Sequence, residues 1–160
     1  MSVIMGLDQS FTSTGVCINS ENGFDFRVIP TVPDKEDPLE KFKRAMFISD
    51  AICDMIKEQN VDKVNIEGLA LGRAIGNSNR DLAILQGVIV CDILKKFSGL
   101  NINIVVPTTL KKFATGKGNA PKDMLFECLP DDIKENLSKI PKSKGRLDLC
   151  DAYWLSVYDI

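Results

Sequence analysis

The chain has 160 residues, of which 44% are hydrophobic and 26% are charged, and its formal net charge at pH 7 is −2. This length suits one domain with a hydrophobic core, and we expect residues 1–160 to form a single domain. Histidine is absent, which excludes a serine–histidine–aspartate triad and removes the commonest ligand of zinc. Any catalysis must therefore use carboxylates, lysines, hydroxyl groups or bound hard metal ions.

The first thirty residues predict three antiparallel strands. Residues 2–8 and 14–19 are apolar and are separated by polar turn residues, which is the pattern of a β-hairpin. Residues 24–29 follow a turn at Asn22 and Gly23 and predict a third strand. Together they form a meander.

Helices and strands alternate in the rest of the chain. Residues 38–60 predict a helix, because Pro38 suits a first turn and apolar side chains recur at helical spacing, namely Phe42, Met46, Ile48, Ile52, Met55 and Ile56. The elements expected after it are a strand over 61–69, a Gly-, Asn- and Ser-rich loop over 71–81, a helix over 80–97, a strand over 101–107, short helices, and a last helix over about 146–158. Strands that are joined by whole helices become parallel neighbours. The expected fold class is therefore α/β, with a mixed five-stranded sheet flanked by helices.

Cysteine usage and hydropathy indicate a reduced, non-membrane environment. Five cysteines lie far apart in apolar surroundings without a CxxC pair, and we expect them to be reduced core residues, namely Cys17, Cys53, Cys91, Cys128 and Cys150. The sequence has no basic and apolar leader and no run of about 18 apolar residues. We therefore expect a cytoplasmic protein.

Charge is distributed unevenly along the chain. Residues 95–146 contain eleven Lys or Arg against five acidic residues, whereas the remainder contains nine basic and seventeen acidic residues. This asymmetry indicates one face for a polyanion such as nucleic acid and another face that is acidic. A solvated, lysine-rich loop region would produce the same count.

Four carboxylates stand in apolar segments that otherwise give no reason for an acid. Asp8 and Glu67 come at the ends of predicted strands, and Asp148 and Asp151 lie three residues apart in the last predicted helix. The carboxyl ends of adjacent parallel strands meet at one edge of a sheet, so these acids can cluster there and bind two Mg²⁺ ions between them. Each acid also has a structural explanation: Asp8 as a turn-initiating residue, Glu67 as a lysine partner, and Asp148 as a helix cap.

Four stretches of the sequence resemble the RuvC-like Holliday junction resolvases, which are metal-dependent endonucleases with a ribonuclease H-like fold. They are GLDQSFTSTGV at residues 6–16, NIEGLALG at 65–72, PTTLKKFATGKGNAPKDML at 107–125 and DLCDAYWLS at 148–156. The third stretch is the most specific, because it combines a lysine-containing segment, a GxGxA turn and a further lysine that begins a helix. The first stretch alone also resembles the opening of sugar kinases.

The resemblance implies a site and a substrate. The catalytic and metal-binding carboxylates would be Asp8, Glu67, Asp148 and Asp151, with two Mg²⁺ ions that Mn²⁺ can replace and no small-molecule cofactor. The residues that contact DNA would be Lys111, Lys112, Lys117 and Lys122, together with the hydroxyls of Ser10 and Thr12. The implied partners are branched DNA, above all four-way junctions, and a second copy of the chain, for which the helix over 80–97 is a candidate interface.

The sequence departs from the family pattern at one informative place. Cellular members often carry a bulky aromatic residue shortly after the strand glutamate, whereas Leu69 and Ala70 stand here. This difference and the acidic composition favour a bacteriophage member, which would act in the cytoplasm of the host cell. The alternatives are a nuclease of the same fold that cuts flaps, forks, other branched DNA or RNA, a non-catalytic junction-binding protein, and an ATP-binding phosphotransferase, for which 160 residues are too few.

Overall fold

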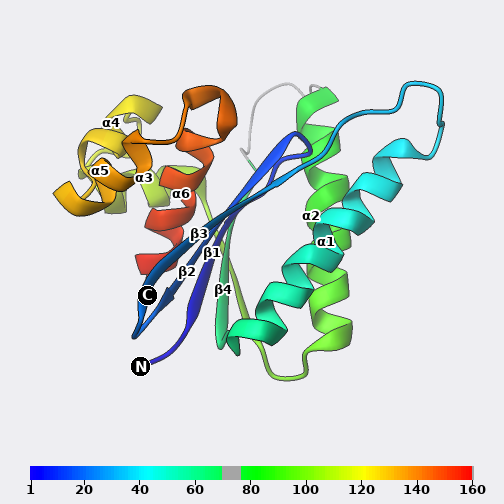
Figure 1. Ribbon diagram of the computed structural model, residues 1–160, viewed down its shortest axis with the longest axis horizontal. Coiled ribbons are helices and arrows are strands. Elements are labelled where there is room, and N and C mark those ends of the chain that lie inside the picture. Colours follow the sequence, from blue (N-terminus) through cyan, green and yellow to red (C-terminus); the bar gives the residue numbers. More distant parts are fainter. Residues whose placement is uncertain (70–76, 160) are drawn as a thin grey trace.

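The computed structural model describes residues 1–69 and 77–159 (Figure 1). Its elements follow the predicted alternation of strands and helices. They are β1 (Ile4–Asp8), β2 (Ser13–Ser20), β3 (Gly23–Pro30), α1 (Glu40–Gln59), β4 (Lys63–Glu67), α2 (Asn77–Lys96), β5 (Asn101–Val105), α3 (Pro107–Thr115), α4 (Lys122–Glu127), α5 (Asp131–Ser138), a 3-10 turn (Lys142–Lys144) and α6 (Arg146–Val157).

The five strands form one mixed sheet in the order β3-β2-β1-β4-β5. β1, β2 and β3 pair antiparallel, as the apolar runs of the first thirty residues predict. β4 pairs parallel with both β1 and β5, because a helical connection returns the chain to the same end of the sheet. The predicted α/β class and the mixed five-stranded sheet are confirmed.

Two layers of helices cover the sheet. α1 and α2 lie on one face, and α3 to α6 lie on the other (Figure 1). Ile48 and Ile52 of α1 and Leu85, Ile89 and Ile93 of α2 are fully buried in the first layer. These three α2 residues therefore belong to the core of the chain, whereas the interface predicted on the remaining surface of this helix stays a prediction.

The first predicted helix is displaced and rotated relative to the expectation. α1 begins at Glu40 rather than Pro38, and Phe42 and Met46 are 51% and 59% exposed. Its buried stripe runs through Ala45, Ile48, Ser49, Ile52, Cys53 and Ile56. The apolar residues of this helix are not confined to one face, so their spacing alone does not identify the side that meets the sheet.

Two further expectations need correction. Cys17, Cys53 and Cys150 are buried, but Cys91 on α2 and Cys128 just after α4 are exposed, and all five are free thiols. Of the loop predicted over 71–81, residues 71–76 lie outside the described residues and the remainder belongs to α2. None of the helices in residues 1–69 and 77–159 has the length and apolar character that crossing a membrane requires.

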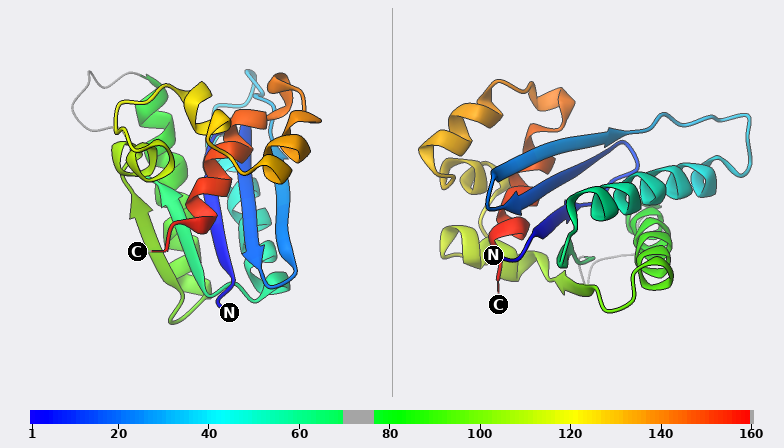
Figure 2. Two further views of the ribbon diagram at one scale, coloured as in Figure 1. Left: turned by 90° about the vertical axis from the view of Figure 1, so that its left-hand side faces the viewer. Right: turned by 60° about the horizontal axis from the view of Figure 1, so that its bottom comes forward.

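α6 lies directly on the backbone of the central strands (Figure 2). A Cβ atom placed on Gly6 of β1 would lie 2.0 Å from the carbonyl oxygen of Ala152, and one on Gly15 of β2 would lie 2.6 Å from that of Asp148. The side-chain amide of the buried Asn65 donates to the carbonyls of Leu155 and Tyr158 at 2.8 and 2.6 Å. These contacts fix the depth of α6 and hence the position of its N-terminal half.

Candidate active site

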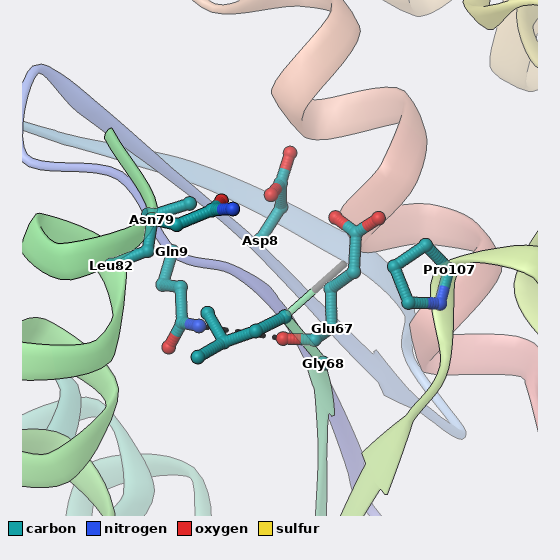
Figure 3. A pocket seen from close by; sticks show the side chains of 8 residues that line it. Asp8, Gln9, Glu67, Gly68, Asn79, Leu82 and Pro107 are labelled. Atoms are coloured by element: carbon teal, nitrogen blue, oxygen red, sulfur yellow. Dashed lines mark hydrogen bonds between the residues drawn. The ribbon is translucent and has the colours of Figure 1, made fainter. Parts of the chain in front are cut away.

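Acidic side chains from three elements meet at one edge of the sheet. Asp8 is the last residue of β1 and Glu67 is the last residue of β4, and these two strands are parallel neighbours. Asp151 comes from α6, which crosses the sheet beside them. One carboxylate oxygen each of Asp8, Glu67 and Asp151 lies within 4.8 Å of the other two. Figure 3 shows the carboxylates of Asp8 and Glu67 side by side beneath α6.

The fourth predicted carboxylate lies one turn earlier on α6. Asp148 is half-buried and is not part of the group that Asp8, Glu67 and Asp151 form, but its charge contributes to the raised pKa of Asp8. The three-residue spacing places Asp148 and Asp151 on the same side of the helix. The structure therefore brings Asp8, Glu67 and Asp151 together and places Asp148 next to this group.

Burial makes this group of acids hard to ionise. Asp8 is 7% and Asp151 is 3% exposed. Burial raises the pKa of Asp8 well above its ordinary value, and the charges of Asp151 and Glu67 raise it further. Burial also raises the pKa values of Glu67, Asp148 and Asp151. Carboxylates in this situation are stabilised by a cation that lies between them.

The donor set fits a hard divalent cation. The three acids each offer a carboxylate oxygen, which Mg²⁺, Mn²⁺ and Ca²⁺ prefer. Oδ2 of Asp8 is buried and has no hydrogen-bond partner, although a buried acceptor normally has one. A cation bound between Asp8, Glu67 and Asp151 would satisfy this oxygen.

Lysines border the acids on the side of α3 and α4. Nζ of Lys122, the first residue of α4, lies 3.2 Å from Oδ2 of Asp151, and its side chain is 53% exposed. The charge of Lys111 on α3 lowers the pKa of Glu67, in opposition to the effect of burial. Lys112 and Lys117 are exposed further out. Lys122 therefore lies between the acids and the solvent.

The turn after β1 is held by its own hydroxyl groups. Oγ of Ser10 accepts the backbone N–H groups of Thr12 and Ser13, and the hydroxyl of Thr14 donates to the carbonyl of Ser10. Ser10 and Thr12 line a groove of about 590 Å³, which the residues around the acids complete, namely Asp8, Gln9, Phe11, Glu67, Asp81, Leu82, Lys122 and Asp148. The acids thus open onto an extended surface.

Comparison with known protein families shows which family the chain belongs to. A family model described as crossover junction endodeoxyribonuclease RuvC matches residues 4–157. The chain belongs to the RuvC family. This family membership makes it a nuclease that cuts DNA at crossover junctions, and divalent metal ions serve the RuvC-like nucleases. No curated protein sequence matches the chain.

Solved RuvC structures share the fold. RuvC from Thermus thermophilus superposes with a TM-score of 0.66 at 17% identity, covering 96% of this chain and 90% of that one. The same organism's RuvC in complex with a Holliday junction substrate gives 0.69 at 16% identity, covering 98% and 91%. The yeast mitochondrial Holliday junction resolvase Ydc2 gives 0.65 at 12% identity, covering 97% and 76%. The sheet and helices described above are thus the ribonuclease H-like fold of the resolvases.

Removal of divalent cations is expected to make the stability of this RuvC-family protein fall as pH rises. The folded state keeps protons on its buried acids at pH values where the unfolded chain, with carboxyl pKa values of about 4, has released them. The free energy of unfolding therefore decreases from about pH 4 upward through the raised pKa values. A divalent cation at about 100 times its Kd should restore about 2.7 kcal/mol, or roughly 8 °C in Tm.

Thermal unfolding between pH 5 and 8, with EDTA and with Mg²⁺, measures this effect. Asp8→Asn is the matched comparison, because it removes the acid whose pKa burial and neighbouring charges raise. The difference in Tm between the wild type and this variant should depend on pH in EDTA. Parallel pH profiles for the two proteins would contradict the expected coupling.

Proposed function

We propose that residues 1–160 act as a single nuclease domain that hydrolyses phosphodiesters of four-way DNA junctions with two Mg²⁺ ions. The observation that supports this most is the group formed by Asp8, Glu67 and Asp151, whose carboxylate oxygens lie within 4.8 Å of one another at the carboxyl ends of parallel strands. Crevices in this position are the usual binding sites of α/β sheets.

In this proposal the four acids hold the metal ions. Asp8 and Asp151 are the most buried and would hold one or both ions, Glu67 would help to hold an ion or orient the attacking water, and Asp148 would complete the set. Bound Mg²⁺ supplies a nucleophile at neutral pH and stabilises charge that develops on the phosphate. Mn²⁺, which prefers the same oxygen ligands, should replace it.

The basic residues would hold the DNA backbone. Lys111 and Lys122 flank the acids and would bind phosphates near the scissile bond, while the exposed Lys112 and Lys117 would contact the strand further out. Ser10 and Thr12 line the same groove and can donate hydroxyl hydrogen bonds to the backbone. Phosphate contacts of this kind make binding steeply dependent on salt concentration.

The proposed substrate is supported by the family membership and by the symmetry of a four-way junction. Family members cut at crossover junctions, and one solved relative binds a Holliday junction. A four-way junction presents two equivalent strands, which suits a homodimer with two sites. We expect the protein to act in the cytoplasm, that of the host cell if it is encoded by a bacteriophage.

Substrate comparison tests this function directly. A synthetic four-way junction, a fork, a flap and an RNA–DNA hybrid of matched sequence would be incubated with the protein and Mg²⁺. We expect the junction to be cut fastest, with paired nicks at symmetric positions of two opposing strands. Equal or faster cutting of forks, flaps or RNA would favour a branched-DNA or RNA nuclease of the same fold. Tight junction binding without cleavage in Mg²⁺ or Mn²⁺ would indicate a binding protein.

A further inference from the structure

The peptide bond that follows Glu67 lies where β1 and β4 separate. Backbone pairing between these strands runs from Ile4–Lys63 to Leu7–Ile66 and stops one residue before Asp8 and Glu67. Pairing between β4 and β5 continues to Glu67, and the next N–H, that of Gly68, donates to Val105 of β5 at 2.7 Å. The carbonyl of the same peptide bond points the opposite way, toward the space that β1 no longer fills.

Beyond the end of β1, two glutamine side chains take over the hydrogen bonding to β4. Nε2 of Gln9, in the turn after β1, donates to the carbonyl oxygen of Glu67 at 3.4 Å, and Nε2 of Gln86, on α2, donates to the same oxygen at 3.1 Å. Figure 3 shows the bond from Gln9. The peptide bond after Glu67 is thus held by β5 on one side and by two side-chain amides on the other.

We propose that Gln9 and Gln86 are positioning residues for the Glu67 carboxylate. This inference rests on the proposed role of Glu67 as a metal ligand. The loss of hydration and the charge of Asp151 both disfavour an ionised Glu67 in this group, so its carboxylate needs a fixed position there. Fixing the backbone on both sides of its peptide bond fixes the direction in which the side chain leaves the strand. Gln9 follows Asp8 directly, so its bond also ties the two strand ends that carry acids.

The environment of Gln9 argues against a purely structural role. Gln9 is only 6% exposed, and its Oε1 atom is buried without a hydrogen-bond partner. It lines a cavity of about 210 Å³ beside Asp8 and Glu67 (Figure 3). An unsatisfied buried amide oxygen destabilises a fold, whereas an apolar side chain of similar length would not. Gln9 therefore serves the arrangement of the site at the expense of stability.

The test combines Gln9→Met, Gln86→Met and the double variant, with Gln59→Met at the far end of α1 as the matched control. Mn²⁺ affinity is measured by calorimetry on the DNA-free protein, and the nicking rate is measured on a four-way junction. Replacing groups that orient metal ligands typically lowers metal affinity or activity about 10- to 100-fold. We expect each single variant to bind Mn²⁺ about 10-fold more weakly and to nick more slowly, with Tm within about 3 °C of the wild type. The double variant should lose more than either, and Gln59→Met should lose nothing.

Each outcome of this test decides between roles. Unchanged Mn²⁺ affinity in the double variant would overturn the proposal, and so would a loss that is matched in Gln59→Met. A loss of affinity that accompanies a large fall in Tm would assign the glutamines to the fold instead. A wild type that binds Mn²⁺ but leaves every junction intact would overturn the proposed function alone, because the Mn²⁺ titrations still compare the variants.

Discussion

Asp8→Asn is expected to lower Mg²⁺-dependent nicking of a four-way junction by about 10³-fold or more. Asp8 stands at the centre of the group, with Glu67 and Asp151 as direct neighbours and Asp148 close by. The substitution keeps the shape of the side chain but replaces a charged ligand oxygen with a neutral amide. Metal ions contribute several kcal/mol to the stabilisation of such transition states, and about 4 kcal/mol corresponds to about 10³-fold in rate. Single-turnover cleavage of an end-labelled junction measures the change.

The same variant should fold at least as well as the wild type. It removes one of several buried, mutually repelling carboxylates, so its Tm in EDTA is expected to equal or exceed that of the wild type. Asp54→Asn, on the exposed surface of α1, is the control and should cleave normally. A wild-type nicking rate for Asp8→Asn would refute the assignment of Asp8 as a catalytic residue. If Asp8→Asn lost both activity and thermal stability while Asp54→Asn kept both, the loss of activity would be attributed to unfolding.

Local patterns determined most of the fold. The meander of β1 to β3 follows from short apolar runs separated by turn residues, and the parallel pairing of β1, β4 and β5 follows from the helices between the strands. The apolar spacing did not predict which side of a helix is buried where apolar residues occur on more than one of its faces. Phe42 and Met46 are as apolar as the buried residues of α1 but face solvent, because tertiary packing chooses the buried face among several that the sequence permits.

The same limit applies to cysteine. Cys17, Cys53 and Cys150 are buried, whereas Cys91 and Cys128 are exposed. All five have apolar neighbours in the sequence, and only the packing of the folded chain separates the two groups: Cys17 of β2 faces the core, whereas Cys91 of α2 is exposed. The number and spacing of the cysteines therefore predict that they are free thiols, but do not predict which of them are buried.

The acids of the site were predictable because each is costly where it stands. Burying an acid without a partner is unfavourable, so the sequence positions of Asp8 and Glu67 at the ends of apolar strands already indicate a shared cation. Gln9 and Gln86 gave no such signal. A glutamine in a turn or on a helix is ordinary, and its role emerges only when the end of β1 and one face of α2 meet at the carbonyl of Glu67.

Gly6→Ala is expected to destabilise the protein by about 3 kcal/mol or more and to remove nicking activity with it. The new methyl group would lie 2.0 Å from the carbonyl oxygen of Ala152 and 2.5 Å from the backbone nitrogen of Ser156. Both atoms belong to the α6 backbone, so the whole helix must move rather than one side chain. Overpacking a core typically costs about 1–3 kcal/mol, and a rigid backbone neighbour places this site at the upper end. Because α6 carries Asp151, its displacement would also separate the acids.

Gly87→Ala provides the matched control for this effect. Gly87 lies on the exposed side of α2, and a Cβ atom there would meet no other atom within 4 Å. Alanine is favoured over glycine inside a helix, so this variant should be more stable by about 0.5–1 kcal/mol. Urea denaturation of the two variants should therefore shift the midpoint in opposite directions. A Gly6→Ala variant with wild-type stability would show that α6 does not rest on the backbone of β1, and the position of Asp151 would then need another explanation.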